Sequence, residues 1–251
     1  MCIRDRFRGH PKLYNDLTPK VFRQEFYSED HLTYSTDNPE IHIIEEFKRL
    51  KPSFGSECPD PTNELEWLIL MQHYGTPTRL LDWTENILVA AFFAVNEKPQ
   101  EDAELWRLYP QKLNSISVGF SGFPILSKNK ELKYLSNEAS FIDPQNPLHV
   151  NSPIAFYPVL AFRRVTAQDG AFTIHPNPRN NNSLTQLPDL DETYLNKYII
   201  PSEFKYRILT DLNSLGVNYR TLMANLDGLS KDLRLKYSNP FWNVWGQPME
   251  E

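Results

Sequence analysis

Apolar residues recur at helical spacing in several stretches of the chain, and each stretch predicts a helix. The first is 64–74, in which Leu65, Leu68 and Ile69 repeat at three- and four-residue intervals before Gly75. Glycine commonly follows the last turn of a helix. The pattern therefore predicts a helix over 64–74 that ends in a turn.

The most apolar stretch of the chain predicts a helix over 83–95. Every residue from Ile87 to Ala94 is apolar, and Asp82 precedes the stretch at the N-cap position, with Glu85 three residues later. A helix that is apolar on all sides does not lie on a surface. We therefore expect 83–95 to be a buried helix at the centre of the fold.

Two further helices are predicted near the end of the chain. One covers 203–215 and ends at Gly216, and its apolar stripe is expected to face a sheet. This stripe consists of Phe204, Ile208, Leu212 and Leu215. Asn218 is expected to cap the other helix, which would run through Leu226 to about Leu235.

Partial alternation of apolar and polar residues predicts four short strands, at 103–109, 159–162, 170–174 and 198–200. We expect 170–174 to pair with 159–162 across a polar turn at 167–169, and 198–200 to be buried. Residues 110–151 are rich in loop-forming residues and are expected to be an insertion. Because helices lie mostly before and after the strands, the order predicts a single α+β domain with a mixed or antiparallel sheet around the buried helix.

The composition is that of an ordinary globular protein, and it excludes several classes. Of 251 residues, 40% are apolar, and 26 Lys and Arg against 32 Asp and Glu give a net charge of −6. This acidity argues against binding along extended nucleic acid. The apolar runs are too short to span a membrane, and two cysteines, Cys2 and Cys58, cannot form a disulfide framework. We expect a cytoplasmic protein, and the sequence carries no signal for its oligomeric state.

The densest group of polar residues lies where the predicted helices 64–74 and 83–95 meet. It reads Gln72-His73-Tyr74-Gly75-Thr76-Pro77-Thr78-Arg79-Leu80-Leu81-Asp82-Trp83-Thr84. A loop anchored by core on both sides can hold a guanidinium, an imidazole, hydroxyls and a carboxylate in fixed positions. The same residues also have a structural interpretation, in which Asp82 caps a helix, Arg79 pairs with Asp82, and His73 interacts with a helix dipole.

Two shorter motifs are further candidates. Phe7-Arg8-Gly9-His10 offers an arginine that could bind a phosphate or carboxylate, or else a surface arginine in a turn. Gln168-Asp169-Gly170-Ala171-Phe172 could place Gln168 in a cleft, where its amide would bind an amide, a ribose or a base. The alternative is that Asp169-Gly170 is simply the turn of a hairpin.

Several known site motifs are absent from the sequence. It contains no GxGxxG or GxxxxGK[ST], which would indicate a Rossmann or P-loop nucleotide site, and no GxSxG, which would indicate a serine hydrolase. It contains no HExxH, and His42, His149 and His175 stand alone. We therefore expect no metal site.

Together, the motifs resemble the FRG domain family, which is named for its aromatic-Arg-Gly opening. The resemblance begins at Phe7-Arg8-Gly9-His10, is strongest from Gln72 to Thr84 and at 90–94, and resumes at Gln168, at Ile199-Ile200-Pro201 and at 226–229. It implies an FRG domain over 7–235, a non-native or truncated leader at 1–6 and a C-terminal tail at 236–251. It also implies a bacterial protein, with a role in phage defence as one expectation, and it names no reaction.

A second resemblance is to ADP-ribosyltransferases, which keep three features in a fixed order. An arginine that engages NAD is followed by a hydroxyl-bearing turn into a helix of Ala and Phe, and then by an acidic or Gln-bearing turn. Arg8, Thr76-Pro77-Thr78 and Gln168 keep that order here. The resemblance implies Arg8 on the pyrophosphate, Thr78 on the nicotinamide side, and Gln168 or Asp169 near the ribose. This chain lacks the Glu-x-Glu pair, and glutamine does not stabilise a developing cation as a carboxylate does.

These motifs predict one site, for which three hypotheses stay open. In an enzyme acting on NAD, the catalytic residues would be Arg8, His73, Thr78, Arg79, Asp82 and Gln168, and NAD would contact Arg8, Gly9, Tyr74, Thr76 and Thr78. In a binding module, the same residues would recognise a small anionic ligand, a nucleotide or a partner without turnover. In a scaffold, Arg79 and Asp82 would only organise the junction between two helices.

Overall fold

A six-stranded sheet forms the centre of the computed structural model, which describes residues 5–23, 39–55, 58–119, 152–158, 163–176, 183–186 and 194–238. The strands lie in the order β4-β5-β2-β1-β3-β6, and each neighbouring pair is antiparallel. Their bounds are β1 Arg6–His10, β2 Leu80–Thr84, β3 Ala103–Leu108, β4 Ile154–Phe156, β5 Gly170–Ile174 and β6 Leu195–Ile200. With helices on this antiparallel sheet, the predicted α+β fold is confirmed.

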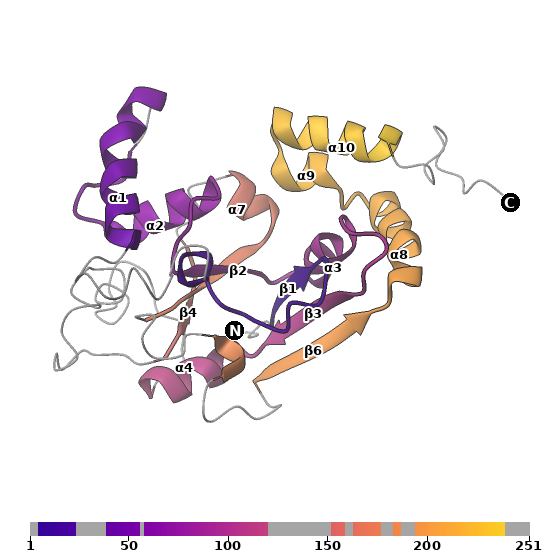
Figure 1. The fold of residues 1–251 in the computed structure, drawn as a ribbon, viewed down its shortest axis with the longest axis horizontal. Helices are drawn as coiled ribbons and strands as arrows, with labels where there is room; N and C mark the ends of the chain where they lie inside the picture. Colours follow the sequence, from indigo (N-terminus) through magenta and orange to yellow (C-terminus); the bar gives the residue numbers. More distant parts are fainter. Residues whose placement is uncertain are drawn as a thin grey trace, which may run out of the picture.

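Helices α1 and α2 lie at one end of the molecule, and α3, α8, α9 and α10 lie towards the other (Figure 1). Their bounds are α1 Pro39–Leu50, α2 Glu64–His73, α3 Ile87–Val95, α4 Pro110–Val118, α7 Arg163–Ala167, α8 Ser202–Ser214, α9 Tyr219–Met223 and α10 Leu226–Ser238. Three short 3-10 turns are Lys20–Phe22, Lys51–Phe54 and Leu184–Gln186. α2 ends within one residue of the prediction.

β1 runs through the middle of the sheet, and α3 packs directly across it. A Cβ atom added to Gly9 would lie 2.0 Å from the carbonyl oxygen of Ala90 and 2.7 Å from the backbone nitrogen of Ala94. The backbones of β1 and α3 are therefore in contact, and glycine is required at this position because it has no side chain to separate them.

The predicted central helix is present, but it begins later than predicted, and its first two residues, Ile87 and Leu88, are 48% and 39% exposed. α3 starts at Ile87, and Asn86 caps it by accepting a hydrogen bond from the Leu88 amide at 3.0 Å. Residues 80–84 form strand β2 instead, so the prediction that Asp82 is the N-cap is wrong. A short apolar run suits a buried strand as well as a buried helix, and its pattern does not separate the two.

α8 matches the predicted helix 203–215 to within one residue, but it buries a different face. Lys205, Leu209 and Leu212 are buried, whereas Phe204 and Leu215 of the predicted stripe are 47% and 67% exposed. α8 packs chiefly on α3, not on the sheet. The Lys205 ammonium is satisfied by four backbone carbonyls at 2.7–3.1 Å, those of Pro11, Glu97, Lys98 and Glu101.

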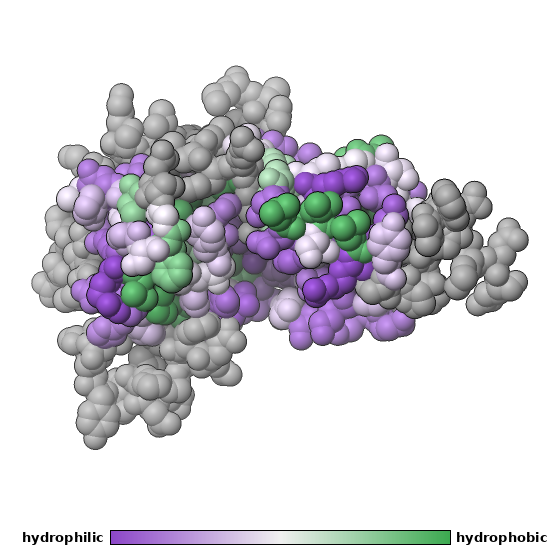
Figure 2. All heavy atoms as spheres, turned by 90° about the horizontal axis from the view of Figure 1, so that it is seen from above, coloured by the Kyte–Doolittle hydropathy of each residue, from purple (hydrophilic) through white to green (hydrophobic). Residues whose placement is uncertain are grey.

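The helix predicted from Asn218 to Leu235 is two helices. Asn218 and Thr221 form a capping box at the start of α9, as expected of an N-cap. Ala224 then adopts the left-handed conformation, with φ 48°, which ends α9 before α10 begins at Leu226. Apolar side chains gather over α10 on one face of the molecule (Figure 2). Its exposed leucines are Leu226, Leu229 and Leu233.

The predicted strands at 103–109 and 170–174 are confirmed as β3 and β5. The end of β6 covers 198–200, but it is largely exposed where burial was expected. β5 pairs with β2 and β4, and helix α7 precedes the turn before it, so the predicted hairpin around 167–169 is wrong. The predicted strand at 159–162 lies outside the described residues.

Strands β1, β2 and β4 and helices α1 and α4 were not predicted. α4 occupies the start of the expected loop-rich insertion 110–151. The Asn114 side chain holds α4 to β4, because it donates to the Ala155 carbonyl at 2.9 Å and accepts from the Ala155 amide at 2.8 Å. Across the described ranges, none of the helices is both long and apolar enough to cross a bilayer.

Candidate functional site

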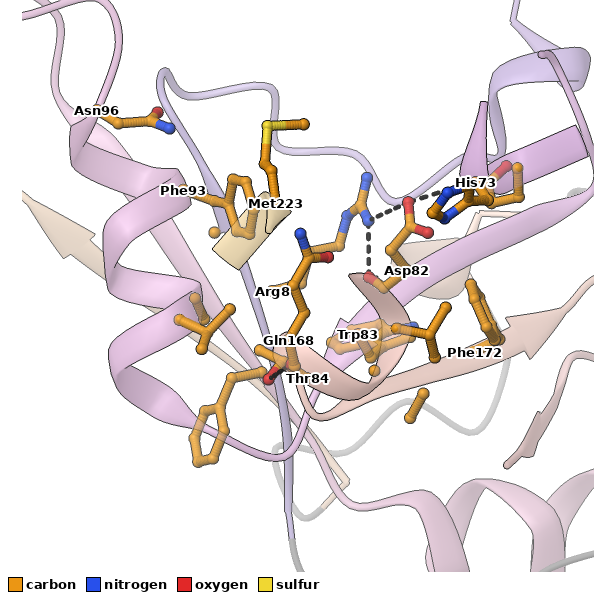
Figure 3. Close-up of a pocket in the computed structure, with 18 of the residues that line it drawn as sticks. Arg8, His73, Asp82, Trp83, Thr84, Phe93, Asn96, Gln168, Phe172 and Met223 are labelled. Atoms are coloured by element: carbon orange, nitrogen blue, oxygen red, sulfur yellow. Dashed lines mark hydrogen bonds and ion pairs between the residues drawn. The ribbon is translucent and has the colours of Figure 1, made fainter. Parts of the chain in front are cut away.

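A cavity of about 340 Å³ lies where the two central strands part, between the sheet and the neighbouring helices. β1 and β2 pair at one position, Phe7 opposite Thr84. Beyond that position the Arg8 side chain, which comes from β1, donates to the Asp82 carbonyl of β2 at 2.7 Å. Here the Arg8 side chain replaces the backbone hydrogen bonds between β1 and β2, and the cavity lies beside it (Figure 3).

The structure brings five of the predicted site residues to this cavity. They are Arg8, Gly9, His73, Asp82 and Gln168. β1, β2, the end of α2 and the turn before β5 supply them, and these elements are far apart in sequence but adjacent in the sheet. In Figure 3, Arg8 and Asp82 meet at the centre of the view, with Gln168 and Phe93 beside them.

Arg8 is the guanidinium of the cavity, and two protein contacts orient it. Its Nε donates to Nε2 of His10 at 2.8 Å, and its Nη1 donates to the Asp82 carbonyl. The carboxylate of Asp82 lies 3.7 Å from the same Nη1. Burial lowers the pKa of the Arg8 guanidinium, and the charge of Asp82 opposes that effect. An arginine remains charged under these conditions.

Asp82 is the exposed position in the middle of the otherwise buried strand β2, with 57% of its side chain exposed. Gln72 donates to its Oδ2 from Nε2 at 2.7 Å. Thr78, which is fully buried, donates in turn to Oε1 of Gln72 at 2.5 Å. This chain of contacts fixes which way the Gln72 amide faces, and so it holds a carboxylate in place at the mouth of the cavity.

Gln168 joins two sides of the cavity. Its side-chain amide donates to the Leu222 carbonyl of α9 at 3.2 Å, and its backbone carbonyl accepts from the Thr84 hydroxyl at 2.6 Å. The side chain therefore links the turn before β5 to α9. Asp169, at the same turn, has φ 46° and is not among the described residues that line the cavity.

Arg79 and Thr78, two further predicted site residues, are buried and do not line the cavity. The Arg79 side chain is 1% exposed, and its Nε donates to Oε2 of Glu40 at 2.5 Å, while its backbone amide donates to Oε1 of the same carboxylate at 2.8 Å. The predicted pairing of Arg79 with Asp82 is therefore wrong. Glu40 lies on α1, so the pair ties α1 to the start of β2.

Tyr74 and Thr76 also lie away from the cavity. Tyr74 is 67% exposed, and both residues border a separate hollow beside α1. His73 lines the cavity from the C-terminal end of α2, and its ring meets that of Tyr74 edge to face at 4.9 Å between centroids. An NAD molecule that contacts Tyr74 and Thr76, as predicted, would therefore have to extend outside this cavity.

Two residues near Arg8 were not predicted to belong to the site. His10 and Glu104 are 7% and 0% exposed, and Nδ1 of His10 lies 2.8 Å from Oε1 of Glu104. His10 was visible in the sequence as part of the opening motif. The signal for Glu104 was a charged residue inside a strand whose other residues are nearly all apolar, because such a residue needs a buried partner.

Aromatic residues from five elements of the fold contribute to the apolar lining of the cavity. They are Phe7, Trp83, Phe93, Phe172 and Tyr219. In the sequence, Phe93 and Tyr219 stand out only as residues of predicted helices. Among the described residues, no group of three or more His, Cys, Asp or Glu side chains is placed to hold a metal ion.

Comparison with known proteins gives one match. The model of the FRG domain family matches residues 4–103. Neither the curated proteins nor the solved structures searched contain a significant match to the chain. The matched segment supplies most of the cavity lining, including Arg8, His73 and Asp82, and later residues such as Gln168 and Tyr219 complete it. Over residues 4–103 the chain is therefore similar to the FRG domain family, in agreement with the resemblance of its motifs.

Proposed function

We propose that the cavity binds a small anionic ligand that carries an aromatic group, and that a nucleotide such as NAD is this ligand. The proposal rests on the hydrogen-bond donors of Arg8 that the protein does not use. A guanidinium has five N–H donors, and within the described part of the chain one is used by His10 and one by the Asp82 carbonyl. The remaining donors suit the oxygens of a phosphate, which arginine binds in a bidentate manner.

The aromatic lining supports the second half of the proposal. Trp83, Phe93 and Tyr219 reach the cavity from β2, α3 and α9. Flat rings stack on such side chains at a gain of about 1–3 kcal/mol for each base. The volume of about 340 Å³ lies near the lower end of the range for ligand pockets. We therefore expect one nucleotide half of NAD to enter and the other half to remain outside.

A reaction on NAD is the second candidate, and the position of Asp82 favours it. In this reaction the bond between ribose C1′ and the nicotinamide nitrogen breaks, and nicotinamide leaves with the bonding electrons. Positive charge then develops at C1′ and the ring oxygen, where a carboxylate stabilises it. Asp82, oriented by Gln72, would supply this carboxylate, and water or an acceptor nucleophile would bond to C1′ and lose a proton. The alternative is a binding module without turnover, for which phage defence remains one setting.

Thermal unfolding in the presence of NAD, ADP-ribose and nicotinamide tests the binding proposal. NAD at a hundredfold its Kd would stabilise the protein by about 2.7 kcal/mol, and uncharged nicotinamide would do much less. Arg8→Gln should abolish the shift. Arg49→Gln, which removes an exposed arginine of α1 paired with Glu46, serves as the matched control and should keep it. An equal shift in Arg8→Gln would overturn the proposal.

Release of nicotinamide distinguishes turnover from binding alone. If Asp82 stabilises the developing cation, Asp82→Asn should lower the rate about 10²-fold while NAD still binds. Binding without nicotinamide release in the wild type would support the module without turnover.

A further inference from the structure

We propose that Glu104 and His10 act in series as positioning residues for Arg8, with His10 held as the neutral Nδ1–H tautomer. The role in ligand binding rests on the proposed function, whereas the arrangement of the three side chains does not.

The three residues lie on two neighbouring strands. Arg8 and His10 are two residues apart on β1, so their side chains leave the same face of the sheet. Glu104 lies directly opposite His10 in the β1–β3 register. The contacts follow in order, 2.8 Å from Glu104 Oε1 to His10 Nδ1 and 2.8 Å from His10 Nε2 to Arg8 Nε.

The hydrogen-bonding capacities of Arg8 and Glu104 determine which ring nitrogen of His10 carries a proton. An arginine Nε carries a hydrogen and can only donate, so Nε2 of His10 must accept and bear no proton. An ionised Glu104 can only accept, so Nδ1 of His10 must donate. Both contacts are satisfied in one state, in which the carboxylate is charged, the imidazole is neutral and the guanidinium is charged.

The surroundings of His10 favour the same state. Its charged neighbours are Glu104 on β3 and Arg8 on β1, Arg23 adds positive charge from the turn that follows Lys20–Phe22, and the Tyr14 ring meets the imidazole edge to face at 5.3 Å. Burial lowers the pKa of His10, as does the charge of Arg8. Burial opposes ionisation of Glu104, yet the hydrogen bonds from His10 and from the Asn15 backbone lower the pKa of its carboxyl overall.

This arrangement fixes the edge of Arg8 that faces the cavity. With Nε held by His10 and one Nη1 hydrogen held by the Asp82 carbonyl, the guanidinium plane is set from two sides. Asp82 Oδ2 lies 3.7 Å from Nη1, so Nη2 is the group that remains for an anionic ligand. If His10 gained a proton, Nε2 would become a donor and this support of Arg8 would be lost.

NMR of the whole chain labelled with ¹⁵N tests the arrangement without any ligand. At pH 7.5 we expect His10 to be protonated at Nδ1 and unprotonated at Nε2, and the Arg8 Nε–H to be protected from exchange with water. As the pH is lowered, the Arg8 Nε–H resonance should change with the same midpoint as the His10 ring. An Nε2–H tautomer at pH 7.5, or an Arg8 resonance that ignores the His10 titration, would overturn the proposal.

Two substitutions of His10 separate its contacts. In His10→Gln, the amide oxygen can accept from Arg8, whereas the shorter amide in His10→Asn can reach only Glu104. Positioning predicts that the Kd for NAD rises tenfold or more in His10→Asn and only a few-fold in His10→Gln. If both variants fold and the Kd for NAD rises equally in the two, His10 does not position Arg8. If NAD binds to neither the wild type nor the variants, the proposed function fails while the NMR result still decides the arrangement.

Discussion

Arg8 and Arg79 belong to motifs of similar appearance, but they have different surroundings. Arg79 is buried, and the carboxylate of Glu40 accepts from both its side chain and its backbone. Arg8 keeps 17% of its side chain exposed at a cavity. We therefore infer a structural role for Arg79, and we propose that Arg8 is the arginine that binds a ligand.

Removal of Arg79 should unfold the domain readily, because it would leave the Glu40 carboxylate buried without its cation. We expect Arg79→Met to lower the free energy of unfolding by about 3–5 kcal/mol in urea titrations. Adding Glu40→Met to this variant should restore part of the loss. Arg8→Gln should cost less than Arg79→Met, and the opposite order would mean that Arg8 is the structural arginine.

The buried pair of His10 and Glu104 should make stability depend on pH. The pKa of His10 is lowered in the folded protein, so at a pH just below the ordinary histidine value of 6.5 the unfolded chain binds a proton at His10 and the folded chain does not. The free energy of unfolding therefore falls as the pH drops through that region. Glu104, whose pKa is also lowered, adds a second loss as the pH falls below 4.5. A tenfold difference in proton affinity between the unfolded and the folded chain corresponds to about 1.4 kcal/mol. Urea titrations from pH 8 to 5 should show a smaller decrease below pH 6.5 in His10→Gln than in the wild type.

At the scale of elements, the sequence predicted long or strongly patterned segments better than short buried ones. α2 and α8 were found to within one residue because glycine follows each of them and their apolar residues recur at helical spacing. The last two residues of β2 were predicted as the start of the helix at 83–95, because β2 and α3 are both short and apolar. Helix α1 was missed, although Pro39 at its first position and Glu40 in its first turn are typical of the start of a helix.

Contact between β1 and α3 predicts a severe effect of a single methyl group. Gly9→Ala would place Cβ 2.0 Å from a backbone oxygen of α3, so the helix would have to move. We expect a loss of about 3 kcal/mol or more in unfolding free energy. Gly216→Ala is the control, since its Cβ meets nothing within 4 Å, and the positive φ of 82° alone should cost about 1–2 kcal/mol. Equal effects of the two changes would show that β1 and α3 are not in contact.

At the scale of the whole molecule, the site depends on a sheet order that the sequence does not reveal. The motifs around Arg8, Asp82 and Gln168 could be found because each combines polar residues with glycine or proline. Their meeting depends on β1 lying between β2 and β3, and on β5 lying beside β2. The pair of His10 with Glu104 follows from the same order, whereas the pair of Arg79 with Glu40 depends on where α1 packs. Spacing along the chain gives no measure of either.

A crystal structure of the protein with NAD is the most direct test of the central claim. We expect a phosphate of NAD within hydrogen-bonding distance of Arg8 Nη2, with one ring against the aromatic side chains of the cavity. Arg8 should keep its contacts with His10 and the Asp82 carbonyl. NAD bound elsewhere, or a cavity that stays empty at NAD concentrations that saturate binding in solution, would show that this cavity is not the binding site.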